Sequence, residues 1–416
     1  MVKRWCVINA YTVANAGDAA ITLGTQVLAR EVGGADIHVA SRYAARDASF
    51  YAAHGISAGP PPVAFPVRGT ASAPGPWRAL VFLWSLVWAV VVSLAYRACP
   101  TMVNGCAFRA LGPGLRAMLT ADVVVVAGGG YLYSAKRKVN LTLIHSLVSM
   151  ILPVLAGKSI LVMPQSIGPL DPTGRTFASL ALGALPVVVV REPISRDFAR
   201  TGLGVRRMRM APDVAFTLAG QRGSHPRGPD VDTPVEVAVV PMDWTWARRT
   251  GTMELETYVA KMADLVVGLN VRGVAVRIVG SSRVAEEDQD DLAVGRRILD
   301  AGHGRGATQV VVVTTATVDE FVEAVAPVRV VVGTRLHACI LAITAGRPAV
   351  ALGYQPKTSG TYEMLGLAQY AHDVERFSVD EVLAQTLSLA EDASVFAGAG
   401  ERAARQVLDC YRDLDR

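Results

Sequence analysis

Short apolar runs rich in β-branched residues alternate with helix-like segments along the chain, and this alternation restricts the fold more than any other feature. Strands that are apolar throughout are typical of parallel sheets whose two faces are covered by helices. The expected strands span 6–9, 37–40, 123–127, 160–163 and 187–190 in the first half, and 235–240, 274–279, 309–313, 328–332 and 349–352 in the second. The pattern predicts an α/β protein built from doubly wound, Rossmann-like sheets.

The stretch GQRGSHPRGPDVDT, at 220–233, separates the two halves of this pattern. Its glycines, prolines and charges are typical of a linker between domains. We therefore expect an N-terminal Rossmann-like domain over 1–219 and a C-terminal one over 234–416, facing each other across a cleft. The last helix of the chain is a candidate to pack back on the N-terminal domain.

The segment ALVFLWSLVWAVVVSLAY, at 79–96, interrupts the alternation with 18 uncharged residues between Arg78 and Arg97. Its length is just sufficient to cross a bilayer. The strands at 6–9 and 123–127 should share one sheet, so both ends of the segment must lie on the same side, which argues against a span. Three alternatives stay open: a helix that is buried or covers the domain, a peripheral contact with the inner membrane face with the arginines at lipid phosphates, and a true span, which this topology disfavours.

The composition argues against several classes of partner. The net charge is only +5, and no Lys/Arg run is as dense as in nucleic-acid-binding tails, so no nucleic acid is expected. The five cysteines form no CxxC pair and the seven histidines no HExxH motif, so no metal is expected. An odd number of cysteines and an apolar N-terminal run too short for a signal peptide favour the cytoplasm.

The first predicted strand is followed by a turn that carries Asn15, Gly17 and Asp18 before a helix expected to start near Ala19. Open α/β sheets bind ligands at the carboxyl ends of their strands, where this turn lies. Gly17 allows a ligand to approach the backbone. Asp18 has two readings, a helix cap or a general base for an acceptor hydroxyl.

Two further turns bring small and polar residues to the same edge. Gly128, Gly129 and Gly130 follow a buried strand directly, and Gln165 follows the next one. The glycines form neither GxGxxG nor a Walker loop, so a dinucleotide or nucleotide cofactor is not expected. They permit positive φ and close approach of a ligand or of the facing domain.

Arg191 stands where the strand of VVVVREPIS meets a helix. A guanidinium there can bind a carboxylate or a phosphate with two hydrogen bonds. The alternative is an ion pair with Glu192 or another acid. Asp213 follows in APDVAF, where a cap or an interdomain contact is expected.

The run VVVGTRLHA in the second half predicts a strand that leads into the N-terminus of a helix, a natural anion site. Thr334 is expected to cap this helix. His337 lies in its first turn, where a bound phosphate would favour protonated imidazole. Arg335 and His337 would point about 200° apart if both were helical, so Arg335 is either a ligand or a brace for the turn. Lys357 follows the next strand and adds a compact positive charge.

The motifs NAGDAAI, AGGGYL, PQSIGPL, VVREPIS, PDVAF, GTRLHA and GYQPKTSG follow one another in an order that resembles the polysaccharide pyruvyl transferase family. The resemblance runs from about residue 8 to residue 370 and is most specific from GTRLHA to Lys357. It implies a two-domain fold like that of GT-B glycosyltransferases. It also implies transfer of the enolpyruvyl group of phosphoenolpyruvate to a sugar, which forms a cyclic pyruvate ketal with loss of phosphate and without a metal or other cofactor.

By position in these motifs, Arg191, His337 and Lys357 are expected to hold phosphoenolpyruvate, with Arg335 as a further donor-site candidate. Asn15, Gly17, Asp18, the three glycines and Gln165 are expected on the acceptor side. His337, Arg191 and Asp18 are the catalytic candidates, and Asp213 and Asp243 are alternatives to Asp18 as base.

The acceptor is expected to be a cell-envelope glycan or its lipid-linked precursor. Two alternatives remain. A glycosyltransferase that uses a nucleotide sugar would need an acid for the ribose near 352–360, and the first carboxylate there is Glu363. A non-catalytic assembly partner would have no need for the intact Arg191, His337 and Lys357.

Overall fold

The computed structural model describes residues 3–33, 35–64, 75–101, 111–134, 141–220, 234–244, 252–284 and 289–412. The chain forms two compact units. Unit 1 contains Met1–Thr12, Thr25–Val214 and Leu408–Arg416, and unit 2 contains Val13–Gly24 and Ala215–Val407. These limits differ from a single division at 219, because the first loop joins the second unit and the chain end joins the first. Residues 221–233 of the expected linker lie outside the described residues.

Unit 1 is built on a five-stranded parallel sheet of order β3-β2-β1-β4-β6. Its strands are β1 (Lys3–Ala10), β2 (Ala35–Ser41), β3 (Ser57–Gly59), β4 (Val123–Val126) and β6 (Ser159–Val162). The order is doubly wound, and β1 and β4 share this sheet as expected from the sequence, where they are neighbours. The segment at 79–96 lies in the connection from β3 to β4, which are parallel strands of this same sheet.

A second parallel sheet of unit 1 has the order β5-β7-β8-β9. Its strands are β5 (Gly129–Leu132), β7 (Gln165–Ile167), β8 (Val188–Val190) and β9 (Met208–Met210). Two residues separate the end of β4 from the start of β5, and two separate the end of β6 from the start of β7. The expected strand at 187–190 is β8, which pairs with β7 and β9 in this second sheet.

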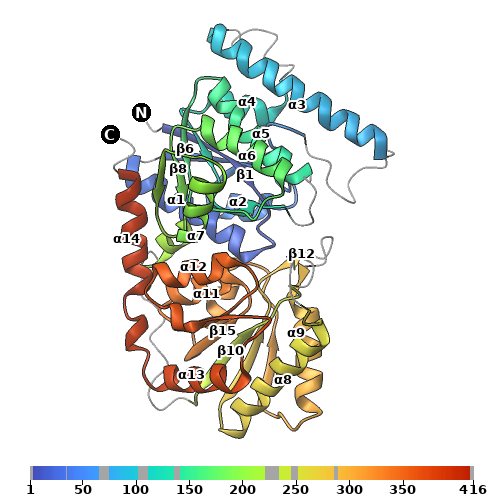
Figure 1. The fold of residues 1–416 in the computed structure, drawn as a ribbon, viewed down its shortest axis with the longest axis vertical. Helices are drawn as coiled ribbons and strands as arrows, with labels where there is room; N and C mark the ends of the chain where they lie inside the picture. The colour runs from blue at the N-terminus through green and yellow to red at the C-terminus, as the bar shows by residue number, and fades with distance from the viewer. Residues whose placement is uncertain are drawn as a thin grey trace. The chain divides into compact units, whose positions relative to one another are not determined.

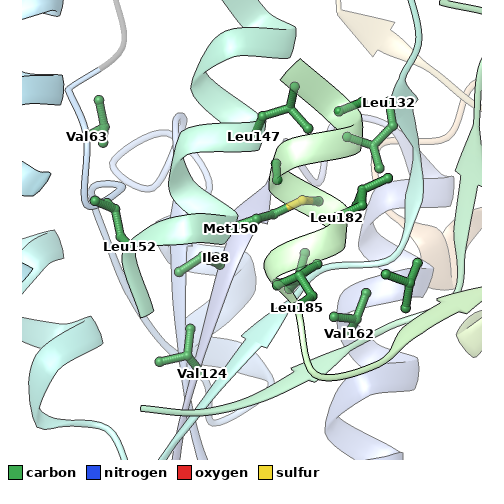
Figure 2. Packing of buried hydrophobic residues seen from close by; sticks show 14 of the residues in the cluster. Ile8, Val63, Val124, Leu132, Leu147, Met150, Leu152, Val162, Leu182 and Leu185 are labelled. Carbon is green, nitrogen blue, oxygen red and sulfur yellow. The ribbon is translucent and has the colours of Figure 1, made fainter. Parts of the chain in front are cut away.

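The helices of unit 1 pack an apolar core against these sheets (Figures 1 and 2). They are α2 (Ala48–Ala53), α3 (Gly75–Ala98), α4 (Pro113–Thr120), α5 (Leu141–Leu155), α6 (Pro172–Ala184) and α7 (Pro193–Asp197). Met150 of α5 and Leu182 of α6 lie in the core together with Val124 of β4. Among the described residues, Leu80–Ala98 is the one helical stretch long and apolar enough to cross a membrane.

Unit 2 is built on a six-stranded parallel sheet of order β14-β11-β10-β15-β16-β17. Its strands are β10 (Glu236–Val240), β11 (Ala275–Val279), β14 (Val310–Val313), β15 (Val330–Gly333), β16 (Ala349–Gly353) and β17 (Ala371–Asp373). Numbered along the chain, this is the order 3-2-1-4-5-6 of a dinucleotide-binding sheet, with its switch point between β10 and β15. All ten expected strands are thus present, with ends that move by at most three residues.

The strands of the unit 2 sheet are connected by helices. They are α8 (Leu255–Val271), α9 (Asp291–His303), α10 (Val318–Val325), α11 (Leu336–Thr344), α12 (Pro356–Met364) and α13 (Val379–Glu391). A short antiparallel pair, β12 (Arg283–Val284) and β13 (Gln289–Asp290), precedes α9. Helix α1 (Ala16–Gly33) begins in unit 2, and α14 (Ala399–Arg412) ends in unit 1, where the Tyr411 hydroxyl donates to Val162 O at 2.5 Å.

Candidate functional site

The candidate site lies at the carboxyl edge of the unit 2 sheet, at the switch point between β10 and β15. Crevices at such points are the usual ligand sites of open α/β sheets. β15 and β16 are parallel neighbours, so the turns that lead into α11 and α12 lie side by side at this edge. The start of α1 joins them, because Ala16 N donates to Ser281 O at 3.0 Å after β11.

Arg335 is bound by Asp291, the first residue of α9. The Arg335 Nε donates to both carboxylate oxygens at 2.9 and 2.8 Å, and Nη2 donates to Oδ1 at 2.8 Å. Asp291 also accepts from Ser281, from the backbone N at 3.1 Å and from Oγ at 3.0 Å. The guanidinium therefore ties the β15–α11 turn to α9 and to the end of β11.

Burial alone would lower the pKa of Arg335, but the charge and hydrogen bonds of Asp291 outweigh it, so this pKa is raised above its ordinary value. The nearby charges of Tyr354 and Asp18 act in the same direction. Arg335 is thus a permanent cation that is largely neutralised inside the protein. This geometry favours the brace over the ligand.

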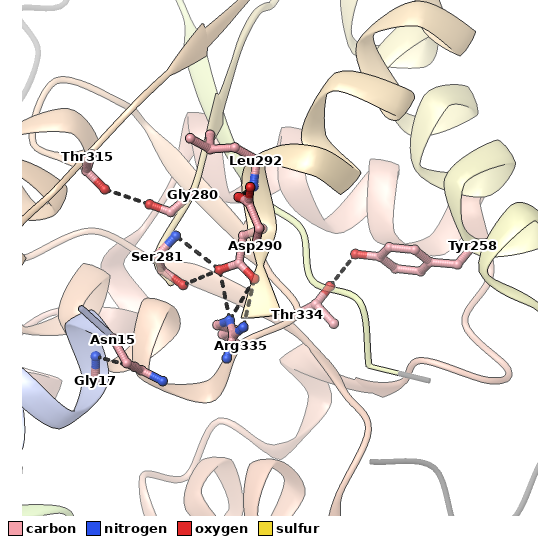
Figure 3. Close-up of polar contacts among 11 residues, drawn as sticks. Asn15, Gly17, Tyr258, Gly280, Ser281, Asp290, Leu292, Thr315, Thr334 and Arg335 are labelled. Atoms are coloured by element: carbon pink, nitrogen blue, oxygen red, sulfur yellow. Dashed lines mark hydrogen bonds and ion pairs between the residues drawn. The ribbon is translucent and has the colours of Figure 1, made fainter. Parts of the chain in front are cut away.

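The start of α11 differs from the expectation in two ways. Arg335 is the N-cap residue in extended conformation, with φ −87° and ψ 126°, so the 200° argument for two helical residues does not apply. Thr334 does not cap the helix. Its hydroxyl shares a 2.7 Å hydrogen bond with that of the buried Tyr258, because its position before the N-cap points it toward α8 (Figure 3).

His337 lies in the first turn of α11 and packs against Gly17 of α1. A Cβ atom on Gly17 would lie 2.6 Å from both Cγ and Nδ1 of the imidazole. Because no side chain fits there, the glycine at 17 is required by the protein's own histidine and not only by a ligand. Two helix N-termini therefore meet at His337.

Helix α1 starts earlier than the sequence suggested. Asn15 caps it, since its Oδ1 accepts from Gly17 N at 2.9 Å and its carbonyl accepts from Ala19 N at 3.1 Å. Asp18 is therefore not the cap but a residue of the first turn. The first two N–H groups of α1 are used by Ser281 and Asn15, so α1 adds the positive end of its dipole to the site, and Asp18 adds a carboxylate.

Lys357 lies in the first turn of α12, on the neighbouring turn of the sheet edge. Its side chain is half-buried, and Nζ lies 5.3 Å from the ring centroid of Tyr354. A cation at this position complements the N-termini of α11 and α12. The structure thus brings Asn15, Gly17, Asp18, Arg335, His337 and Lys357 to one edge of unit 2.

Arg191 belongs to unit 1 and is 1% exposed. Its Nη1 donates to Asp213, and its Nε donates to Ser166 Oγ at 2.7 Å. The alternative of an ion pair is therefore realised, with Asp213 as the acid. A pair this deeply buried makes Asp213 a poor base for an acceptor hydroxyl, and it leaves the donor-binding role of Arg191 a prediction.

The remaining acceptor-side candidates also lie in unit 1, where β4 breaks and β5 begins. Gly129 has φ 134° and takes a conformation that favours glycine. Gln165 is fully buried, and its Nε2 donates to Ala127 O at 2.5 Å and to Met163 O at 3.0 Å. Both residues hold the junction between the two sheets, while Gly128 and Gly130 flank Gly129.

A sequence comparison decides the family. The family description "Polysaccharide pyruvyl transferase" matches residues 15–356. The chain belongs to the polysaccharide pyruvyl transferase family. The amylovoran biosynthesis protein AmsJ of Erwinia amylovora is 23% identical over 283 residues, which are 64% of this chain and 64% of AmsJ.

Solved structures confirm the GT-B-like α/β fold of this family member. A putative UDP-N-acetylglucosamine 2-epimerase of Listeria monocytogenes superimposes with a TM-score of 0.57 at 10% identity, covering 100% of this chain and 97% of that one. HepE of Anabaena, solved with UDP and glucose, gives 0.57 at 12% identity, with coverage of 99% and 98%. A glycosyltransferase of Rickettsia africae gives 0.55 at 9% identity, with coverage of 100% and 97%.

Several residues of this candidate site were missed in the sequence. Asp291 and Ser281 organise Arg335, and Tyr258 holds Thr334. The acid at the start of α9 was visible in AEEDQDDLAV, but the five carboxylates of this stretch gave no reason to single out one. Among the described residues, no group of three or more His, Cys, Asp or Glu could hold a metal ion.

Proposed function

We propose that this family member transfers the enolpyruvyl group of phosphoenolpyruvate to a sugar of a cell-envelope glycan or of its lipid-linked precursor, forming a pyruvate ketal. The family supports the transfer, and the similarity to a protein of amylovoran biosynthesis supports a polysaccharide acceptor. The observation that carries the proposal is the meeting of two helix N-termini at His337, beside Lys357.

The donor is a small, highly charged anion, and the site supplies what such an anion needs. N–H groups in the first turn of a helix have no partner within the helix and attract phosphate. His337 lies in that turn of α11, and Lys357 lies in that turn of α12. In the proposal His337 binds the phosphate and Lys357 binds the carboxylate or the phosphate, while Arg335 keeps the α11 turn in place.

The reaction needs one proton donor and one base. Protonation of C3 leaves C2 of the enolpyruvyl group electron-poor, and a sugar hydroxyl adds to it and loses its proton. The C2–O bond to phosphate then breaks, the phosphate leaves with the electron pair, and a second hydroxyl of the same sugar closes the ketal. Of the two hydroxyl protons, one balances the proton added at C3 and the other leaves with phosphate.

His337, charged by the bound phosphate, is the proposed acid, and Asp18 is the proposed base. Asp18 is close enough for its charge to raise the pKa of Arg335, so it lies near the same turn. The Asp18 carboxylate would repel the anionic phosphoenolpyruvate. It is therefore better suited to act on the hydroxyl of the neutral sugar.

Transfer from a nucleotide sugar remains the alternative, because the fold occurs in glycosyltransferases. The structure places Glu363, the first acid after β16, in the last turn of α12 and exposed. It lies two turns away from Lys357, which is too far along the helix to serve a ribose at the helix start. This observation favours phosphoenolpyruvate.

We also propose that the enzyme acts in the cytoplasm at the inner face of the plasma membrane. Lipid-linked sugars are presented there, and the mostly exposed helix α3 offers a contact for that surface.

The test is incubation of the purified protein with phosphoenolpyruvate and candidate glycans, followed by phosphate release and by an acid-labile mass gain on the glycan. His337→Ala should weaken phosphoenolpyruvate binding, measured by calorimetry, and abolish turnover. His303→Ala, at an exposed histidine in the last turn of α9, is the matched control and should behave as wild type. Equal phosphoenolpyruvate affinity in wild type and His337→Ala, with no phosphate release, would refute the proposal. Release of a nucleotide from a nucleotide sugar would establish the alternative.

A further inference from the structure

Helix α3 lies on the outside of unit 1 (Figure 1) and carries many exposed apolar side chains. Six of its exposed apolar side chains repeat at intervals of three and four, which places them on one face of the helix, and Val81, Leu83 and Trp88 are exposed beside them. We call this set the α3 outer stripe: Trp77, Leu80, Trp84, Val87, Val91 and Leu94. Trp84 is 69% exposed and Trp77 is 61% exposed. A stripe of this length exceeds the scattered apolar residues of an ordinary protein surface.

The opposite face of α3 is part of the protein core. Phe82 is 2% exposed and Ala89 is 1% exposed, and both belong to the apolar cluster around α5. The Phe82 ring stacks on the imidazole of His145 in α5, with centroids 6.5 Å apart. Moving α3 into a bilayer as a span would strip this packing, so the structure favours a helix that keeps one face in the protein.

The net charge of this part of the sequence indicates which kind of partner the exposed face of α3 binds. Residues 48–170, which contain α3, α4 and α5, include nine Lys or Arg and a single acid, Asp122. This region therefore carries +8 in a chain whose total is +5, and the rest of the chain carries −3. Of these nine cations, Arg78 and Arg97 flank the apolar segment in the sequence, and basic residues in that position are typical of proteins that bind anionic lipid.

The C-terminal end of α3 shows this arrangement in detail. The exposed Arg97 donates to Val154 O at 3.3 Å, and Lys158 Nζ lies 5.5 Å from the ring centroid of Tyr96. Arg97 stands at the end of the outer stripe, where it can reach a lipid phosphate while the stripe enters the interface, whereas the half-buried Lys158 donates from Nζ to Leu119 O at 3.0 Å.

We propose that the α3 outer stripe is a monotopic docking surface for an anionic membrane, with the helix lying parallel to the bilayer plane. A second copy of the chain is the competing occupant. A second copy of this positively charged part of the sequence would offer it no complementary charge, which favours anionic lipid over self-association. This proposal is separate from the proposed reaction, because the stripe would bind lipid whether or not the enzyme turns over.

The experiment measures flotation of the full chain with vesicles of phosphatidylcholine alone or mixed with phosphatidylglycerol. The triple variant Leu80→Gln/Trp84→Gln/Val87→Gln removes three exposed side chains of the stripe and leaves the buried face of α3 intact. Phe177→Gln/Leu180→Gln changes two exposed apolar side chains of α6 in the same unit and is the matched control.

Wild type and the control should bind the anionic vesicles, more weakly at high salt, and the triple variant should lose at least about tenfold in partitioning. Equal binding of the triple variant, or no binding of wild type, would overturn the proposal. So would a dimer of wild type that the triple variant abolishes in solution without any vesicle binding. Phosphate release from soluble glycan reports the proposed chemistry separately, so failure of one proposal is distinguishable from failure of the other.

Discussion

The imidazole of His337 occupies the space where a side chain at Gly17 would stand, 2.6 Å from the position of its Cβ. This contact joins the N-termini of α1 and α11, which are more than 300 residues apart in the chain. The backbone of α1 at Gly17 therefore limits where the His337 side chain can lie at the proposed donor site.

Substitution of Gly17 should therefore damage the site while the fold persists. In Gly17→Ala the new methyl group must displace His337, and misplacement of a reacting group by about 1 Å can lower a rate about 100-fold. We expect a loss of this order in kcat/KM for phosphate release. Gly33→Ala, in the same helix with no atom within 4 Å of the new Cβ, should retain wild-type activity. Full activity of Gly17→Ala would show that His337 can move without consequence.

Asp291 should matter for stability as well as for the site. Asp291→Asn leaves the buried cation of Arg335 without its charge partner, and breaking such a pair costs about 3–5 kcal/mol. The measurement is urea unfolding monitored by circular dichroism. Asp300→Asn, at an exposed acid of the same helix, should change the free energy of unfolding by less than about 0.5 kcal/mol.

A double variant separates loss of the pair from general damage to the turn. Asp291→Leu/Arg335→Leu removes both charges, and the double change should cost less than the sum of the single changes because no unpaired charge remains. Additive losses would show that Asp291 and Arg335 do not stabilise each other.

His145 should make unit 1 sensitive to acid. Arg42 Nη2 lies 3.2 Å from its Nδ1 and can only donate, while the Val63 carbonyl, 3.1 Å from Nε2, can only accept. The ring is therefore neutral with its proton on Nε2. Burial and then the charge of Arg42 lower the pKa of His145 from 6.5 to about 3.

Because the unfolded chain binds a proton near pH 6.5 and the folded chain does not, stability is full above that pH and falls as the pH drops toward 3. The expected slope is about 1.4 kcal/mol per pH unit. In His145→Gln this component should disappear from the pH dependence of urea unfolding. His303→Gln, at an exposed histidine, should keep it. An unchanged slope in His145→Gln would assign the acid sensitivity to other groups.

The sequence predicted what depends on local pattern and missed what depends on packing between distant segments. The strands are recognisable because each is a short β-branched run bounded by turns, and the residues that follow them were located correctly at the sheet edge. The partner of Arg335, in contrast, lies 44 residues upstream on a helix whose sequence offers several acids. The assignment of Val13–Gly24 to unit 2 likewise follows from contacts with Ser281 and His337, which no local pattern encodes.

The cysteines provide a last prediction, which bears on the β15–α11 turn. Cys339 is buried, its thiol donates to Gly333 O at 3.6 Å, and burial raises its pKa to about 12. Burial raises the pKa of Cys6 to about 12 as well. At about pH 8 the thiolate fraction of such a group is about a thousandfold lower than that of an ordinary thiol.

Iodoacetamide should therefore modify the exposed Cys99 in the native protein and leave Cys6 and Cys339 unmodified, as peptide mass mapping would record. Unfolding in guanidinium should make all three react, which controls for detection. A Cβ on Gly333 would lie 2.7 Å from the Cys339 sulfur, so an alkylated Cys339 cannot be accommodated under the turn. Rapid labelling of Cys339 in the native chain would mean that α11 separates transiently from β15. The anion site proposed at the N-terminus of α11 would then not be held in a fixed position.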